Sequence, residues 1–291
     1  MIGSIRMVLD APKRFRNTAL AMRKRELRSA RLIEMLQLNR RLDVRTVVES
    51  FDISEATVRR MFTQLENEGK VIRTHGGVRL APHLGSDYSY FLSASHRNRE
   101  KTLIGRAAAE IVGSRDRLFL DSGTTVLKLA EALSLRLQSG AVKGIVVLTS
   151  SLVLVEALAR WCTVILVGGE ARLERRDVCG PLSEENLRRY RVNRAFFGAD
   201  AIHLKSGFMT TDERTAKMDE IALRNSSHSY VLADSEKFTL DSFVSYASLD
   251  QVELVITDPG IPPALLQEFT QAGARIRVAA AAGKQPGHAA D

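Results

Sequence analysis

Residues 51–80, FDISEATVRRMFTQLENEGKVIRTHGGVRL, decide how the N-terminal part of the chain folds. Asp52-Ile53 predicts a tight turn after a short helix. Ser54 follows at the expected N-cap of the next helix, because its hydroxyl can accept from the free N–H groups of a first helical turn. Apolar residues then recur at three- and four-residue steps, which predicts one buried helix face. These are Val58, Met61, Phe62 and Leu65.

The opposite face of this helix is polar and basic. It carries Thr57, Arg59, Arg60, Thr63 and Gln64. Gly69 predicts the end of the helix. Two β-like runs, 71–74 and 78–80, flank His75-Gly76-Gly77 and predict a hairpin. A major groove accepts such a helix, and a hairpin wing with Arg73 can lie along phosphates. The alternative is a helix–hairpin module whose basic face is simply solvated.

The charge of the 291-residue chain is concentrated at this end. Residues 1–80 hold 17 Lys or Arg and 9 Asp or Glu, whereas residues 81–291 hold 25 of each. The whole net charge of +8 therefore lies with the helix–hairpin segment. This distribution favours a polyanion as the partner of the N-terminal part and a different partner for the rest.

The chain divides into five predicted segments. Residues 1–22 are expected to be a flexible basic extension, and it is open whether residues 1–21 belong to the native protein. Residues 23–81 form the winged helix-turn-helix domain, with an amphipathic helix at 24–38 and a second helix starting at Asp43. Residues 82–94 are a linker, 95–278 an α/β domain and 279–291 a disordered tail.

The α/β domain is predicted from strand signals that alternate with helix signals. Most of the strands are continuous apolar runs, which is typical of a parallel sheet buried on both faces. The strands are expected near 118–120, 145–148, 164–167, 195–197, 230–232 and 254–256. A helix through Ile104 and Ala108 precedes them, and others are expected at 125–135, 151–160, 183–190, 212–225 and 263–272.

Polar and small residues follow most of these strands. In an open α/β sheet the ligand lies beyond the carboxyl ends of the strands, so these residues are expected to converge. Asp121-Ser122-Gly123-Thr124-Thr125 opens a helix and can cradle an anion with free N–H groups and hydroxyls. The others are Thr149-Ser150-Ser151, Gly168-Gly169, Asp200, Lys217 and Lys237. Each alone is also compatible with ordinary capping or packing.

Both halves of the chain resemble the DeoR family of bacterial transcription regulators. The N-terminal match rests on Ser54, Thr57, Val58, Arg59 and Arg60, on Leu65, Glu66 and Gly69, and on Arg73, His75, Gly76 and Gly77. The C-terminal match rests on Asp121-Ser-Gly-Thr-Thr125, Gly168-Gly169, Gly198-Ala199-Asp200, Lys217 and Asp234-Ser-Glu-Lys237-Phe238. Three places depart from the family pattern: Met61-Phe62 replaces Asp-Leu, Ser150 replaces Asn, and Ala201 replaces Gly.

The resemblance implies a regulator, expected to be a repressor, of a carbohydrate catabolic operon. It implies a sensor domain similar to ribose-5-phosphate isomerase and CoA-transferase folds, a phosphorylated sugar or polyol effector, operator DNA and a homo-oligomer. By position, residues 122–125 are expected to hold the phosphate. Lys217 and residues 149–151 would contact the sugar or its phosphate. Asp121, Asp200 and Lys237 would either bind the hydroxyls of the sugar or hold the strand ends in place.

Two other readings of the α/β domain stay open at this point. One is an isomerase-like enzyme that uses Asp121, Asp200 and Lys217 for proton transfer. The other is a purely oligomerising domain. The cysteines, Cys162 and Cys179, have no metal-ligand spacing, and buried thiols in a reducing cytoplasm are expected. No metal, cofactor or membrane span is predicted.

Overall fold

The computed structural model describes residues 27–29, 31–33, 35–36, 41–67, 70–74, 76–80 and 90–280. The predicted extension at 1–22, the helix end at Gly69, His75 and most of the predicted linker and tail lie outside these ranges. The chain splits into two compact units, Met1–Leu92 and Ser93–Asp291.

The N-terminal unit is a winged helix-turn-helix. Residues 27–29, 31–33 and 35–36 are helical. They precede α2 (Val44–Phe51), α3 (Glu55–Asn67), β2 (Val71–Thr74) and β3 (Gly77–Leu80). Asp43 caps α2 by accepting from the Thr46 N–H at 2.7 Å. Asp52 has a φ of 50°, in the left-handed region, so the predicted tight turn is confirmed.

The wing has a third strand that was not predicted. β1 (Arg41–Asp43) pairs with β3, giving the antiparallel order β1-β3-β2. A three-residue strand has too little alternation to be recognised in a sequence. The expected apolar face of α3 is confirmed, since Val58, Phe62 and Leu65 are fully buried in the core of this unit.

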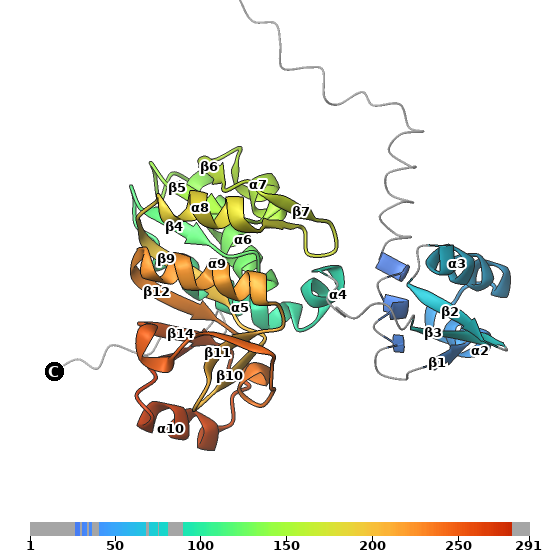
Figure 1. Ribbon diagram of the computed structural model, residues 1–291. Helices are drawn as coiled ribbons and strands as arrows, with labels where there is room; N and C mark the ends of the chain where they lie inside the picture. The colour runs from blue at the N-terminus through green and yellow to red at the C-terminus, as the bar shows by residue number, and fades with distance from the viewer. Residues whose placement is uncertain are drawn as a thin grey trace, which may run out of the picture. The chain divides into compact units, whose positions relative to one another are not determined.

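The second unit is built on a seven-stranded parallel sheet (Figure 1). Its strand order is β15-β14-β12-β9-β4-β5-β6, and every pairing in it is parallel. The strands are β4 (Arg117–Leu120), β5 (Val146–Thr149), β6 (Thr163–Leu166), β9 (Val192–Gly198), β12 (Ser226–Leu232), β14 (Leu254–Thr257) and β15 (Ile276–Val278). Six of them were predicted, and β15 was not.

Helices cover both faces of this sheet. On one face the core includes residues of α5 (Asn98–Ala109), α6 (Thr124–Gln138) and α7 (Leu152–Leu158). On the other face it includes residues of α8 (Pro181–Arg188), α9 (Glu213–Arg224) and α10 (Pro263–Gln271). The sheet is therefore buried on both sides, which explains the continuous apolar runs of its strands.

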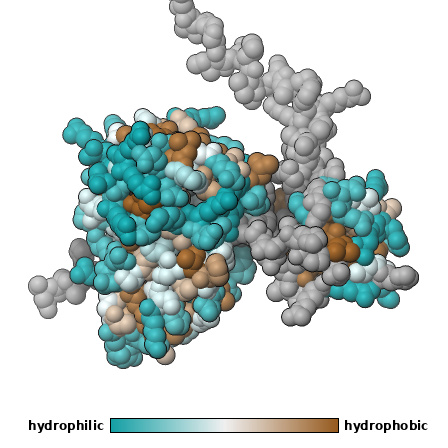
Figure 2. Space-filling view, in the orientation of Figure 1, coloured by the Kyte–Doolittle hydropathy of each residue, from teal (hydrophilic) through white to brown (hydrophobic). Residues whose placement is uncertain are grey.

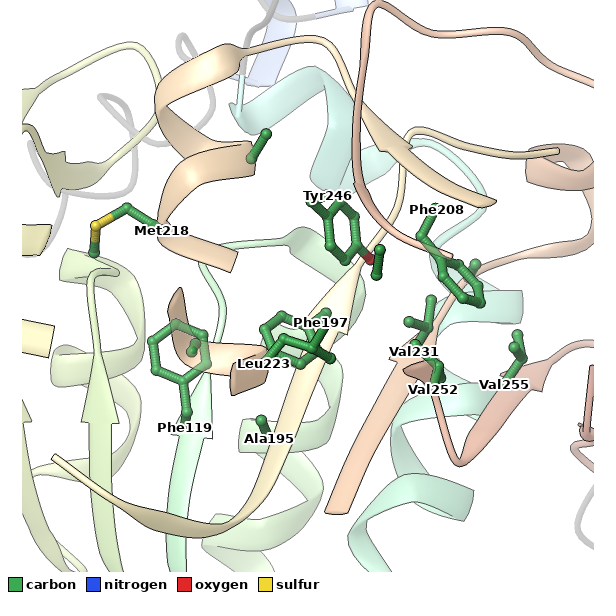
Figure 3. Packing of buried hydrophobic residues seen from close by; sticks show 14 of the residues in the cluster. Phe119, Ala195, Phe197, Phe208, Met218, Leu223, Val231, Tyr246, Val252 and Val255 are labelled. Atoms are coloured by element: carbon green, nitrogen blue, oxygen red, sulfur yellow. The ribbon is translucent and has the colours of Figure 1, made fainter. Parts of the chain in front are cut away.

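Shorter elements lie around the sheet. β10 (Ala201–His203), β11 (Gly207–Thr210) and β13 (Val244–Ala247) form a small antiparallel sheet. β7 (Glu170–Arg172) and β8 (Asp177–Cys179) form a hairpin, and two 3-10 turns span Ser235–Phe238 and Leu249–Gln251. Phe208 and Tyr246 of the small sheet pack near Phe197 of β9 (Figure 3).

One close helix contact positions the candidate site. α5 crosses α6 at Gly105, where an added Cβ would lie 2.4 Å from the carbonyl carbon of Lys128. Any side chain at this position would push the two helices apart. α4 (Tyr90–Ser95) precedes α5, so the last part of the predicted linker is helical, and its Tyr90 is buried.

Candidate functional site

The basic face of α3 is exposed as predicted. Arg59, Arg60 and Thr63 are exposed, and Thr57 is partly so. The Arg59 guanidinium lies 2.6 Å from Glu55, one turn earlier. The Nε of Arg60 donates to the Ala56 carbonyl at 3.3 Å. Both guanidinium groups are therefore held along the outer face of the helix, with N–H donors left for an anionic partner.

Ser54 begins α3 in a different way from the one expected. Its backbone carbonyl accepts from the N–H groups of Thr57 and Val58 at 2.9 and 3.1 Å. Its hydroxyl lies 2.9 Å from the Thr57 hydroxyl. The expected bond from a backbone N–H to the Ser54 side chain is thus replaced by a hydroxyl pair on the polar face.

Arg73 ties the wing to α3. Its guanidinium donates to the Thr63 hydroxyl at 2.9 Å and lies 5.7 Å from the centre of the Phe62 ring. Gly76 has a φ of 78°, as the turn of the wing requires. Gly77 lies against β1, where an added Cβ would be 2.1 Å from the Leu42 carbonyl oxygen. These contacts fix the wing relative to the helix.

In the second unit, Asp121 joins the ends of two central strands. Its carboxylate accepts from the backbone N–H groups of Ser122 at 2.5 Å, Gly123 at 3.3 Å and Gly198 at 3.0 Å. Burial raises the pKa of Asp121 to about 6, although these three donors favour its charged form. Asp121 therefore holds the loop that starts α6 against the end of β9.

The start of α6 carries a buried cation that the sequence analysis missed. Lys101 of α5 is 3% exposed, and its ammonium donates to the Thr124 hydroxyl at 3.0 Å and to the Ser93 carbonyl at 2.5 Å. Burial lowers the pKa of Lys101 to about 8, against the attraction of Asp234. A positive group thus lies at a helix N-terminus, where the helix dipole also favours an anion.

Lys101 was detectable in principle. It lies three residues before Ile104 and seven before Ala108, on the apolar stripe of α5, where a lysine is unexpected. Arg97 of the same segment was also missed. Its guanidinium lies 3.3 Å from Asp234, at the end of β12, and 3.3 Å from Asp258, at the end of β14.

A buried ion network holds the β7–β8 hairpin beside this loop. Arg172 donates to both oxygens of Asp177 at 2.9 and 2.8 Å and to Asp212 at 2.6 Å. Burial acts against the charge of Arg172, but these bonds outweigh it and raise its pKa. Burial likewise opposes the charge of Asp212, yet Arg172 holds the pKa of that carboxyl at about 2. The Ser122 hydroxyl donates to Asp177 at 3.2 Å.

The predicted residues after β5 are buried at the same edge of the sheet. The Thr149 hydroxyl donates to the Leu120 carbonyl at 2.6 Å, and the Ser151 hydroxyl caps α7 by accepting from Leu154. Both hydroxyls thus make local contacts, whereas Ser150 is only 5% exposed and makes none with its hydroxyl among the described residues.

The Gly168-Gly169 pair lies against its own chain. An added Cβ at Gly169 would be 2.0 Å from the Ser183 hydroxyl and 2.5 Å from the Cys179 carbonyl oxygen, at a φ of 123°. Close packing of α8 and β8 therefore accounts for a glycine at this position.

The remaining predicted residues come from three different segments, and the charges of Asp200 and Lys237 both act on Lys101. The Asp200 carboxylate accepts from the Thr210 hydroxyl at 3.1 Å and from the Thr211 N–H at 2.9 Å. Lys237 is partly buried in the first 3-10 turn. Lys217 is half-exposed on α9 and pairs with Glu220 at 2.9 Å. The buried ionisable side chain of α9 is Asp219, which is 2% exposed.

Several other expectations concern metals, thiols and membranes. The described residues contain no group of three or more His, Cys, Asp or Glu arranged to hold a metal ion. Burial raises the pKa of Cys162 to about 11, which disfavours its thiolate, and Cys179 is buried. In the described part of the chain, no helix is long and apolar enough to cross a bilayer. In Figure 2, hydrophilic residues cover most of the upper part of the second unit, and its lower part mixes hydrophilic and hydrophobic residues.

Comparisons with known proteins agree with this geometry. Residues 28–83 match the DeoR-like helix-turn-helix domain, and residues 96–259 match the DeoR C-terminal sensor domain. The chain is 30% identical to the transcriptional repressor AccR of Agrobacterium fabrum, over 84% of this chain and 96% of that protein. It is 30% identical to the lactose phosphotransferase system repressor of Lactococcus lactis, over 84% and 95%. It is 27% identical to GlpR of Haloferax volcanii, over 86% and 96%.

Among solved structures, ribose 5-phosphate isomerase from Plasmodium falciparum is similar at 17% identity. The structural match covers 47% of this chain and 51% of the isomerase chain, with a TM-score of 0.36. The two domain matches cover α3, the wing and the edge of the sheet that holds Asp121, Thr124 and Asp200. They favour a transcriptional regulator over the isomerase-like enzyme. The chain belongs to the DeoR family of helix-turn-helix transcriptional regulators.

Proposed function

We propose that the protein is an operator-binding repressor of a carbohydrate catabolic operon that a phosphorylated sugar or polyol inactivates. The observation that carries the effector assignment is the buried ammonium of Lys101 beside the Thr124 hydroxyl at the N-terminus of α6. A buried cation at this place is best stabilised by an anion. The similar proteins include the transcriptional repressor AccR, which supports a repressor, and a lactose phosphotransferase system repressor, which supports control of sugar use.

The phosphate is expected to bind the backbone and hydroxyl donors of residues 122–125 together with Lys101. Lys101 is preferred over Lys217, because Lys217 is half-exposed and already paired with Glu220. Asp200 and Lys237 stay candidates for contacts with the sugar hydroxyls. Which sugar phosphate binds is left to experiment.

The same contacts offer a route from the effector to the DNA-binding unit. The boundary between the two units falls between Leu92 and Ser93, inside α4. The Ser93 carbonyl accepts from Lys101, and its hydroxyl lies 3.4 Å from that of Thr124. A phosphate that binds the Lys101 ammonium and the Thr124 hydroxyl competes with Ser93 for these two donors. It thereby favours the arrangement in which α4 is released, which is the differential binding that a switch requires.

A thermal-shift panel followed by a DNA-release assay tests this function. A ligand at about one hundred times its Kd adds about 2.7 kcal/mol of apparent stability. A duplex selected from a random library supplies the operator, and each stabilising sugar phosphate is then titrated into the complex. Lys101→Met is expected to abolish both effects, and Lys143→Met, at an exposed loop position, is the matched control.

Three outcomes would contradict the proposal. Absence of stabilisation by every phosphorylated sugar and polyol would refute the effector class and favour a purely oligomerising sensor domain. Retention of full response in Lys101→Met would refute the proposed phosphate site. Loss of the response in Lys217→Met but not in Lys101→Met would favour Lys217, the lysine indicated by the sequence, as the residue that binds the effector.

A further inference from the structure

Asp219 is the carboxylate on the inner face of α9. It lies three residues after Ala216 and four before Leu223, both of which are buried. Its side chain is 2% exposed, yet among the described residues it has neither a hydrogen bond nor a salt bridge. A buried carboxylate without a donor is costly, so its retention here calls for a physical reason.

The surroundings of Asp219 are negative. Burial raises the pKa of its carboxyl well above the ordinary value, and the charges of Asp121, Asp177 and Asp200 raise it further. Among the described residues, no cation lowers the pKa of this carboxyl. The Tyr246 hydroxyl is also near these carboxylates, but it donates to the Gly198 carbonyl at 2.6 Å.

The other three carboxylates have donors of their own. Asp121 accepts from three backbone N–H groups, Asp177 from Arg172 and Ser122, and Asp200 from Thr210 and Thr211. Arg172 is already shared between Asp177 and Asp212. Asp219 is therefore the member of this group that has no donor of its own among the described residues, although it interacts with the charges of the other three.

A metal ion does not account for the arrangement, because these carboxylates are not arranged as a metal-binding group. The acidic group and the proposed phosphate cradle meet in one loop, since Asp121 directly precedes Ser122 and holds the Gly123 N–H. A molecule that occupies both places needs an anionic end for the cradle and a cationic end for Asp219.

We propose that the effector is a phosphorylated amino sugar whose protonated amine binds Asp219, with its phosphate at Lys101 and Thr124. This rests on the proposed function and names the class of effector. An ammonium group neutralises the acidic group and supplies charge-assisted hydrogen bonds, which a hydroxyl of the same size does not. Because the free protein holds a proton at this carboxyl more tightly than usual, binding of the amine is coupled to release of that proton.

Isothermal titration with matched pairs tests the inference. The probes are glucosamine 6-phosphate against glucose 6-phosphate, and galactosamine 6-phosphate against galactose 6-phosphate. In at least one pair the amine is expected to bind at least about tenfold more tightly, which is about 1.4 kcal/mol. Titration at neutral pH in two buffers of different ionisation enthalpy is expected to show proton release for the amine and not for its hydroxyl partner.

Variants then assign the preference to one side chain. Asp219→Asn is expected to weaken the amine about tenfold and the hydroxyl ligand less than about threefold. Asp241→Asn, at an exposed position, is expected to change neither. Should Asp219→Asn fail to fold, the affinity ratio and proton release of the wild type still decide the question.

The failures can be told apart. Equal affinity within both pairs, or equal loss of both ligands in Asp219→Asn, would overturn the amine inference and leave the sugar-phosphate site standing. Absence of binding by all four probes and by the wider phosphate panel would overturn the proposed function, and the inference with it.

Discussion

Replacement of Arg172 by Met is expected to be the most damaging single change in the sensor unit. The substitution keeps the aliphatic volume of the side chain and removes only the guanidinium. It leaves Asp177, which is 2% exposed, and the partly buried Asp212 without their shared cation. The same change also removes one contact between the β7–β8 hairpin and the first turn of α9, because the Thr215 hydroxyl loses its bond to Arg172.

The size of the effect follows from the burial of the partners. Removal of one member of a buried ion pair costs about 3–5 kcal/mol, because the remaining charge is stranded in the interior. For a domain of about 150–250 residues, 1 kcal/mol lowers the Tm by about 2–4 °C, so a loss of roughly 6–20 °C is expected. Arg214→Met is the matched control on α9, since Arg214 and its partner Glu170 are 49% and 65% exposed. Its Tm is expected to stay close to that of the wild type.

Denaturant unfolding followed by the fluorescence of Trp161 measures this loss in the sensor unit, because the chain has one tryptophan. A double-mutant cycle sharpens the result. Asp177→Asn is expected to destabilise the wild type, but to stabilise Arg172→Met by removing the stranded charge. Two results would refute the reasoning: a loss of less than about 1 kcal/mol in Arg172→Met, or the same effect of Asp177→Asn in both backgrounds.

Three further predictions concern the helices. Arg60→Ala or Arg59→Ala is expected to cost about 1–3 kcal/mol of operator affinity and to relax base preference, measured by fluorescence anisotropy; unchanged affinity in both variants would refute α3 as the recognition helix. Gly105→Ala is expected to cost about 1–3 kcal/mol of stability and to weaken sugar-phosphate binding, because the added Cβ would lie 2.4 Å from Lys128. Gly113→Ala, with only Asp116 at 3.7 Å, is its control, and equal melting temperatures would contradict the helix-crossing argument. Since the pKa of Asp219 is raised in the folded state, its ionisation destabilises the fold as the pH rises above the ordinary carboxyl pKa. Asp219→Asn is therefore expected to raise the Tm at pH 7 and leave it nearly unchanged at pH 4, and the opposite pH order in melting curves would contradict the sign.

The sequence predicted secondary structure best where one pattern of apolar residues extends over several helical turns or recurs in several strands. Val58, Phe62 and Leu65 repeat at helical spacing, and burial of exactly that face is what the fold requires. The apolar runs of β4, β5 and β9 likewise predicted a sheet covered on both faces. The short strands β1, β10 and β11 were missed because three or four residues contain at most two repeats of a strand pattern.

The roles of the side chains at the site stay predictions, and the structure adds Lys101 and Asp219, which the sequence pattern did not single out. Loop composition pointed to residues 122–125 and to Asp200, and these do lie at the carboxyl ends of strands. Lys217 was chosen on α9, although the helix buries Asp219 and leaves Lys217 paired with Glu220. A shift of two residues along a helix turns a side chain by more than half of a full rotation at about 100° per residue.

The sequence by itself determined the winged helix-turn-helix, the parallel α/β unit and the concentration of positive charge at the N-terminal end. Local periodicity and composition carry that information. Only the tertiary structure decided that Lys101 meets Thr124, 23 residues away, and that Arg172 meets Asp212, 40 residues away. It also decided that Asp219 is left among carboxylates. The energy of a buried charge depends on which distant groups the fold places around it, and no local pattern records those neighbours.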